Sequence, residues 1–197
     1  MNEFISKETI IGKNVKIYPN VFIEGKCKIG DNTIIYPGSF IVDSEIGENC
    51  IIKYSNITNS KIGNNVVVGN YSTIRDNAVI MDNAKVGTCV EIKKSIVGKG
   101  SKVPHLSYIG DAVIGENVNI GAGAITANYN GKEKNKTIIG DNCFIGTNVN
   151  MIAPITVGSN ALVAAGSTIN KDVPENSLSI ARERQVNKEN YYEKKNK

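Results

Sequence analysis

The chain contains a single histidine, His105, and histidine is the side chain whose ordinary pKa lies closest to neutral pH. His105 follows Pro104, and Lys93, Tyr108 and Asn119 lie close to it in the sequence. An imidazole with a lysine, a tyrosine and an asparagine nearby is suited to act as a general base, which removes a proton from an attacking group. A lone histidine is also compatible with a bystander on the surface, so the elements that hold it must decide between the two.

A six-residue repeat of aliphatic residues runs through most of the chain. It begins with Ile11, Ile17, Ile23, Ile29, Ile35 and Ile41, continues after a one-residue slip from Ile46 to Ile92, and returns from Ile139 to Ile169. Six residues advance an α-helix by about 600°, so the repeat cannot make one apolar stripe on a helix. Short strands separated by turns do satisfy it.

Each hexad is interpreted as one strand and one corner. Strand side chains alternate between faces, so each anchor shares its inward face with the residue two positions before it. That second position is small or β-branched, as in Val15, Val21, Cys27, Thr33, Ser39, Cys50, Val66, Ala78, Ala84, Val118 and Cys143. The corners read Gly-x-Asn, and both residues tolerate the left-handed backbone that tight corners need.

Three strands and three corners make a triangular coil of about 18 residues, and such coils stack like neighbouring strands of a sheet. The repeat therefore predicts an all-β parallel solenoid of about 8–9 coils, formed by residues 1–173. Residues 174–197 lose the repeat and are expected to form a partly ordered C-terminal extension that packs across the last coils.

The position just before each anchor should point outward, yet it is often apolar. Examples are Ile10, Phe22, Ile34, Phe40, Ile51, Val67, Val79, Ile138, Phe144 and Leu162. A monomer seldom leaves so much apolar surface in water, although β-propensity alone is an alternative explanation. Burial against copies of the same three-sided column, around a threefold axis, predicts a homotrimer.

Composition narrows the class of protein. Half of the net charge of +4 comes from the tail KENYYEKKNK, which gives no reason to expect nucleic acid as a partner. No apolar run reaches the length of a membrane span and no signal-peptide core is present, so we expect no membrane contact and a cytoplasmic location. The four cysteines lack CxxC spacing, which predicts reduced thiols and no metal. Cys89 alone falls at a corner, and no role is assigned to it.

The repeat is interrupted twice, at VPHLSYIGD and at TANYNGKEKNK, residues 126–136. A solenoid carries insertions as loops, and loops on a rigid scaffold commonly carry function. Val103 is an anchor, so Pro104 and His105 are expected at a projecting corner. The GAGA run at 121–124 would let a ligand approach the backbone, whose N–H groups are suited to stabilise an oxyanion.

HLSYIGD and NIGAGAITANYNG carry a resemblance to a known family. They are similar to the acetyltransferase domain of the bifunctional N-acetylglucosamine-1-phosphate uridyltransferase/glucosamine-1-phosphate acetyltransferase, a branch of the left-handed β-helix acyltransferases. The resemblance implies a left-handed β-helix that trimerises, with active sites at subunit interfaces. It also implies transfer of acetyl from acetyl-CoA to the amine of glucosamine 1-phosphate, on the route to UDP-N-acetylglucosamine and the cell wall.

The resemblance also implies roles for individual residues. His105 is the general base. The sugar phosphate is contacted by Arg75, Lys93, Tyr108 and Asn119, with Lys134 as a further basic position. Acetyl-CoA is lined by Ala122, Asn128, Tyr129, Thr147, Ala165 and Arg182, with Lys188 as a further basic position in the tail. A thioester is already activated, so direct attack by the amine needs no covalent enzyme intermediate.

The family's nucleotidyltransferase domain has no counterpart in this sequence. We therefore expect no uridylyl transfer and no magnesium requirement, and a separate nucleotidyltransferase is a candidate partner. Three alternatives stay open: the same chemistry on another, nucleotide-linked amino sugar; a zinc enzyme resembling the γ-class carbonic anhydrases; and a non-catalytic scaffold. The zinc alternative is disfavoured because it needs three histidines and the chain has one.

Overall fold

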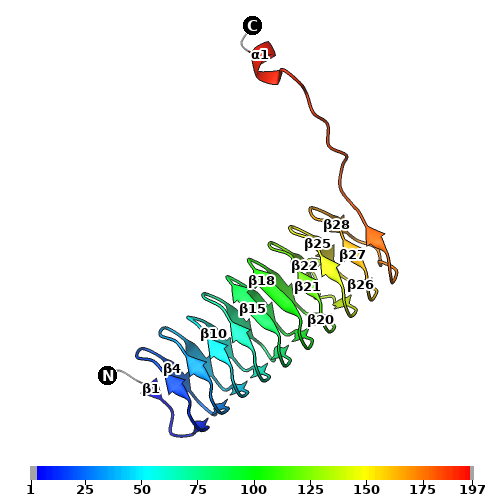
Figure 1. Cartoon of the computed structure of the whole chain (residues 1–197). Helices are drawn as coiled ribbons and strands as arrows, with labels where there is room; N and C mark the ends of the chain where they lie inside the picture. The colour runs from blue at the N-terminus through cyan, green and yellow to red at the C-terminus, as the bar shows by residue number, and fades with distance from the viewer. Residues whose placement is uncertain (1–3, 196–197) are drawn as a thin grey trace.

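The computed structural model describes residues 4–195, and Figure 1 shows a long column of stacked three-sided coils. Three parallel sheets, here called A, B and C, form the sides of the column. Sheet A contains β1 (Phe4–Ile5), β4 (Phe22–Glu24), β7 (Phe40–Val42), β10 (Asn56–Thr58), β13 (Thr73–Arg75), β16 (Glu91–Lys93), β19 (Tyr108–Gly110), β22 (Ile125–Ala127), β25 (Asn150–Ile152) and β28 (Thr168–Ile169).

The other two sheets follow the same pattern. Sheet B contains β2 (Ile10–Ile11), β5 (Lys28–Ile29), β8 (Glu45–Ile46), β11 (Lys61–Ile62), β14 (Val79–Ile80), β17 (Ile96–Val97), β20 (Ala112–Ile114), β23 (Thr137–Ile139) and β26 (Ile155–Val157). Sheet C contains β3 (Lys16–Ile17), β6 (Ile34–Ile35), β9 (Ile51–Ile52), β12 (Val67–Val68), β15 (Lys85–Thr88), β18 (Lys102–His105), β21 (Asn119–Ile120), β24 (Phe144–Ile145), β27 (Leu162–Val163) and β29 (Leu178–Ser179).

The parallel solenoid predicted from the repeat is confirmed, but it has about ten coils and not eight or nine. Strands begin at Phe4 and continue to Ser179, beyond the part of the chain over which the repeat is clear. Several coils are also shorter than the three full hexads that the repeat predicts. Phe40 of β7 pairs with Asn56 of β10, which in turn pairs with Thr73 of β13, and both of these coils fall short of three hexads.

The core is a single column of aliphatic side chains inside the triangle. Ile23, Ile41, Ile74 and the other anchors from the second coil onward are buried, as predicted. The exceptions are Ile11, which is 42% exposed, and Ile17, which is partly buried, because both lie in the first coil and have no full coil below them.

Three of the four cysteines lie in this core. Burial raises the pKa of the Cys27, Cys50 and Cys143 thiols. A thiol with a raised pKa is a poor nucleophile, which agrees with the prediction that these three residues pack the core. Cys89 is exposed at a corner, where its φ is 55°.

The corner motif Gly-x-Asn divides two tasks between its residues. Asn32, Asn49 and Asn65 have φ of 58°, 56° and 56°, so the asparagine supplies the left-handed turn. The glycine supplies close approach. A Cβ placed on Gly30 would lie 2.5 Å from the Gly47 carbonyl carbon in the next coil. The expectation that both residues serve the left-handed conformation is therefore correct only for asparagine.

Two segments depart from the column. β22 continues to Ala127, so the protruding loop comprises residues 128–136 and is slightly shorter than the predicted 126–136. The tail adds β29 to sheet C, and Thr168 N donates to the Ala181 carbonyl at 3.1 Å. Beyond Ala181 the chain leaves the column and reaches α1 (Tyr191–Lys195), as Figure 1 shows. The expected packing of the tail across the last coils therefore ends at Ala181. None of the helices described is long and apolar enough to cross a membrane.

The division of tasks at the corners gives a stability prediction. Replacing Asn65 by Ala should lower the free energy of unfolding by about 1–2 kcal/mol, because a Cβ-bearing residue without a polar group resists the left-handed conformation. Replacing it by Gly should change that free energy by less, since glycine adopts φ near 56° without strain. Urea unfolding of the three proteins measures both values, and equal losses in Ala and Gly would contradict the interpretation.

Candidate functional site

The predicted site residues gather mainly along two edges of the column, and both edges border sheet A. The edge between sheets C and A, here the C–A edge, carries His105, Ala122, Thr147, Ala165 and Arg182. The edge between sheets A and B, here the A–B edge, carries Arg75, Lys93 and Asn128, together with the loop that contains Tyr129 and Lys134. The outer face of sheet A lies between them.

His105 is the last residue of β18 and pairs with Thr88 of β15. Pro104 and His105 therefore end a strand and do not form the corner, where Leu106 makes the turn with φ of 44°. The His105 carbonyl accepts hydrogen bonds from Ser107 Oγ at 2.7 Å and Gly123 N at 3.4 Å. The backbone is thus fixed, while the side chain is exposed at the edge.

The residues predicted to line acetyl-CoA above His105 stack one coil apart. Asn148 N donates to the Ala122 carbonyl and Gly166 N to the Thr147 carbonyl, both at 2.8 Å. The neighbouring glycines keep the coils close: a Cβ on Gly121 would lie 2.5 Å from Thr147 N. A strip of small residues therefore runs along the C–A edge from His105 to the exposed Arg182. Lys188 lies farther along the exposed tail.

The N–H groups of the GAGA run are mostly occupied by backbone acceptors. Gly121 N donates to the Ile145 carbonyl at 2.7 Å, and Gly123 N donates to the His105 carbonyl. Ala124 N donates to the Gly121 carbonyl at 3.3 Å. Within this run of the described chain, the Ala122 N–H is the one without a backbone acceptor. Of the four N–H groups expected to stabilise an oxyanion, only the Ala122 N–H is therefore free of a backbone acceptor in the described chain.

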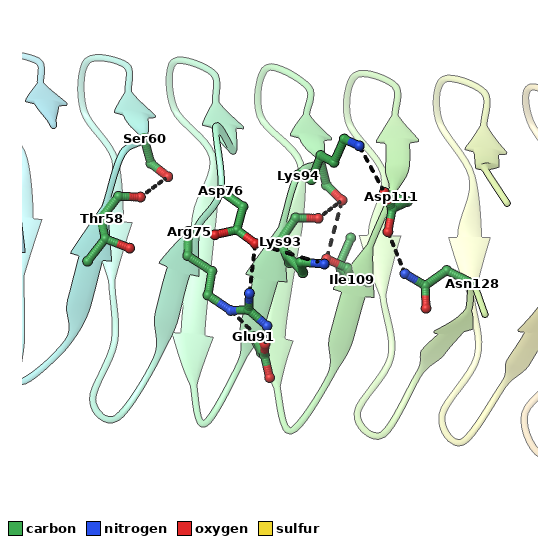
Figure 2. Close-up of polar contacts among 11 residues, drawn as sticks. Thr58, Ser60, Arg75, Asp76, Glu91, Lys93, Lys94, Ile109, Asp111 and Asn128 are labelled. Carbon is green, nitrogen blue, oxygen red and sulfur yellow. Dashed lines mark hydrogen bonds and ion pairs between the residues drawn. The ribbon is translucent and has the colours of Figure 1, made fainter. Parts of the chain in front are cut away.

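The A–B edge carries a compact charged cluster, drawn in Figure 2. Arg75 of β13 pairs in register with Lys93 of β16. The Arg75 guanidinium donates to Glu91 Oε1 from Nε at 3.0 Å and from Nη2 at 2.6 Å, and its Nη1 donates to Asp76 Oδ2 at 2.8 Å. The Glu91 hydrogen bond is the main reason that the pKa of Arg75 is raised. Lys93 Nζ lies 3.8 Å from Asp76 Oδ2.

Two lysines meet at this cluster. The side chain of Lys93 is only 13% exposed, and Lys134 comes to it from the protruding loop. The Lys134 amine beside it is the main cause that lowers the pKa of Lys93, because a second positive group disfavours the protonated form, and loss of solvent lowers it further.

Tyr108 completes the cluster. Its ring covers Gly110, where a Cβ would lie 2.5 Å from the tyrosine hydroxyl oxygen. Arg75, Lys93 and Lys134 outnumber Asp76 and Glu91 by one charge. An arginine and two lysines in this arrangement suit a phosphate dianion.

Two predicted residues stand apart from these clusters. Asn128 is only 6% exposed and donates from Nδ2 to Asp111 Oδ2 at 2.6 Å, so its amide faces the base of the loop. Asn119 lies in β21 on the outer face of sheet C, between Lys102 and Phe144. One chain alone therefore does not bring Asn119 to the Arg75–Lys93 cluster.

The sequence prediction missed three carboxylates, Asp76, Glu91 and Asp111, each of which holds a predicted residue. Asp76 directly follows Arg75, and Glu91 lies close to one coil length farther along the chain. One coil length from Arg75 reaches Lys93, and Glu91 lies two residues before Lys93 on the same outer face of β16, so counting by coil length and strand alternation would have indicated this neighbour. No three His, Cys, Asp or Glu side chains of residues 4–195 come together as a metal site requires.

Sequence comparison matches the chain to three hexapeptide families. Residues 36–119 match the GlmU-like, C-terminal hexapeptide family. Residues 8–42 match the bacterial transferase hexapeptide (six repeats), and residues 112–131 and 136–171 match the hexapeptide repeat of succinyl-transferase. The matches together cover nearly the whole solenoid.

Curated relatives agree with the first of these families. The chain is 55% identical over 192 residues to the bifunctional protein GlmU of Thermoanaerobacter pseudethanolicus, and 53% identical over 188 residues to that of Carboxydothermus hydrogenoformans. These alignments cover 98% and 95% of this chain but 42% of each relative, so the chain spans about two fifths of their length.

Solved structures match the fold. The LpxA UDP-N-acetylglucosamine acyltransferase of Bacteroides fragilis aligns over 89% of this chain and 68% of its own, with a TM-score of 0.70 and 24% identity. The Arabidopsis UDP-N-acetylglucosamine acyltransferase aligns over 91% of this chain and 69% of its own, with a TM-score of 0.57 and 18% identity.

The lysine pair gives a prediction that needs no substrate. Replacing Lys134 by Met removes the neighbouring amine and its like charge, so the pKa of Lys93 should rise toward its ordinary value. The measurement is an NMR titration of the lysine side chains labelled with ¹³C at Cε. The control is Lys132→Met in the same loop, which should leave the Lys93 titration unchanged. A Lys93 pKa that stays low in Lys134→Met would contradict the contact.

Proposed function

This chain belongs to the family of the C-terminal hexapeptide domain of GlmU, and from that membership we propose that it is an acetyl-CoA-dependent glucosamine-1-phosphate N-acetyltransferase. The observation that carries the proposal is the placement of His105 and the Arg75–Lys93–Lys134 cluster on opposite edges of one face, sheet A. A base and a dianion site that flank the same face suit a substrate with an amine and a phosphate.

The proposed reaction is a direct transfer. The sugar amine attacks the thioester carbonyl carbon, a C–N bond forms and the C–S bond breaks. The exposed His105 imidazole takes the proton that the amine loses and returns one to the departing thiolate of coenzyme A. No nucleophilic side chain is required, in keeping with the raised pKa values of the buried thiols.

The sugar phosphate would bind at the A–B edge. A dianion next to Lys93 and Lys134 favours the protonated form of Lys93 and so opposes the effect that lowers the pKa of Lys93 in the free protein. Arg75 must share its guanidinium between the phosphate and Glu91. The guanidinium is accessible to a ligand because the Arg75 side chain is 35% exposed. Tyr108 would contribute its hydroxyl beside the same phosphate.

Acetyl-CoA would lie along the C–A edge as co-substrate. Ala122, Thr147 and Ala165 leave a strip without bulky side chains, which fits an extended pantetheine arm. Arg182 and Lys188, at the end of that strip and in the tail, are suited to phosphates of the coenzyme. Asn128 and Tyr129 belong to the loop at the other edge, so a role for them at acetyl-CoA requires a coenzyme bound by another copy.

The outer face of sheet C supports a homotrimer with shared active sites as part of this proposal. The outer face of sheet C presents Phe144, Leu162 and Leu178, which are 49%, 43% and 61% exposed. These three side chains form a row in register, and Asn119 continues that row. Burial of the row against a second copy would bring Asn119 toward sheet A of that copy.

An assay of thiol release from acetyl-CoA tests the activity. With glucosamine 1-phosphate the wild-type protein should turn over, and His105→Ala should lose about 100- to 10,000-fold in kcat, as expected for a missing general base. Coenzyme A should still raise the melting temperature of His105→Ala.

Glucosamine and a nucleotide-linked amino sugar serve as comparison acceptors in this assay. Turnover of one of these acceptors, with no turnover of glucosamine 1-phosphate, would reject glucosamine 1-phosphate as the substrate. Unchanged kcat in His105→Ala would reject the mechanism.

Shared sites predict complementation between two inactive variants. Lys93→Ala removes the substrate contact that sheet A contributes, and Asn119→Ala removes the one that sheet C contributes. Mixed trimers, made by unfolding and refolding the two variants together, should recover activity because some sites combine an intact sheet A with an intact sheet C. Each variant refolded alone should stay inactive. A mixture no more active than the separate variants would contradict the shared site.

A further inference from the structure

We propose that Asp111 is a positioning residue that seats the 128–136 loop on the A–B edge and thereby places Lys134 beside Lys93. The kinetic consequence rests on the proposed function. The seating of the loop does not, because it follows from contacts within one chain.

Asp111 joins the strand layer to both ends of the loop. Its Oδ2 accepts from Asn128 Nδ2 at 2.6 Å, at the start of the loop. Its carbonyl accepts from Thr137 N at 3.3 Å, directly after the loop, and its own N–H donates to the Lys93 carbonyl at 3.1 Å. Figure 2 shows Asp111 between Lys94 and Asn128, with Lys94 Nζ 3.9 Å from Oδ1.

The contact with Asn128 lies away from solvent. Asp111 is 9% exposed and Asn128 is 6% exposed. A hydrogen bond to an ionised acceptor is stronger than one between neutral groups, and a buried donor left without a partner is costly. Without the Asp111 carboxylate, the Asn128 amide would have to find water, which requires the base of the loop to open.

The loop itself is a small ordered hairpin, so displacement at its base moves it as a unit. Asn135 N donates to the Asn128 carbonyl at 2.7 Å, and Tyr129 forms an antiparallel bridge with Lys134. Asn130 Oδ1 accepts from the N–H groups of Lys132 and Glu133, each at 2.9 Å. Lys134 is therefore carried by a rigid hairpin whose attachment to the column includes the Asp111 carboxylate.

Asp43 provides a comparison at the same edge, in an exposed position where Asp111 is buried. It has φ of 43° where Asp111 has 49°, and it also follows a strand of sheet A. Its Oδ1 accepts from Lys26 N at 2.9 Å, but the corner of the adjacent coil there carries no inserted loop. Glycine suits both positions because their φ is positive, so Asp→Gly removes each carboxylate without backbone strain.

The experiment compares Asp111→Gly, Asp43→Gly and Asp111→Asn in the protein as it assembles. The first readout is limited trypsin digestion with mass spectrometry, followed at Lys132, Lys134 and Lys136. Cleavage in the loop should accelerate about tenfold or more in Asp111→Gly, because cleavage tracks the opened fraction. It should stay at the wild-type rate in Asp43→Gly. Asp111→Asn keeps an acceptor oxygen and should restore part of the protection.

The second readout separates positioning from general stability. In Asp111→Gly, the KM for glucosamine 1-phosphate should rise roughly 10- to 100-fold, since Lys134 leaves the phosphate site, and kcat should fall less. The KM for acetyl-CoA should change by less than that for the sugar phosphate. Asp43→Gly should keep all three constants, and the melting temperature of the column should be similar in the two Gly variants.

Each outcome decides the proposal. Loop cleavage at the wild-type rate in Asp111→Gly, or equal acceleration in Asp43→Gly, would overturn it. Accelerated cleavage together with an unchanged sugar-phosphate KM would overturn the positioning role. Accelerated cleavage in a protein that acetylates no amino sugar, wild type included, would support the seating and reject the proposed function.

Discussion

Every structural feature of this protein depends on the hydrogen-bonded register between one coil and the next. Parallel pairing sets Ile57 between Ile41 and Ile74, and the same alignment repeats along the column. A shift of one residue within a strand would send its inward side chain to the outer face. Variation in length is therefore confined to the corners: Phe40 pairs with Asn56 across a short coil, whereas Ile125 reaches Asn150 only after the inserted loop.

This confinement explains why the chemical groups collect at two edges. His105 ends β18 and Asp111 follows β19, so one rigid coil supplies both the base and the seat of the loop. The strands hold Arg75 and Lys93 in register, and the loop at the adjacent corner adds Lys134. The cationic cluster is thus partly fixed by the sheet and partly delivered by an insertion, and the loop is the part that a single contact can release.

The sequence predicted the features that depend on periodicity. The inward anchors, the small inward cysteines and the outward apolar positions all follow from a period that a strand can satisfy and a helix cannot. It predicted less well where side chains meet across coils. Coils of unequal length make such neighbours hard to count, so the bond between Asp111 and Asn128 was missed. Asn119 and Lys93 lie on different faces of one column, so the predicted grouping of these two residues depends on a second copy of the chain.

The carboxylates in the cationic cluster have a physical purpose that the residue types alone do not reveal. Arg75, Lys93 and Lys134 would repel one another strongly if nothing intervened, and the lowered pKa of Lys93 records that repulsion in part. Asp76 and Glu91 reduce the repulsion and hold the Arg75 guanidinium in one place. A dianion that arrives must compete with them for Arg75, which weakens binding. In return, the cations are already oriented when it arrives, and the two lysines, whose repulsion a dianion relieves, contribute most of the attraction.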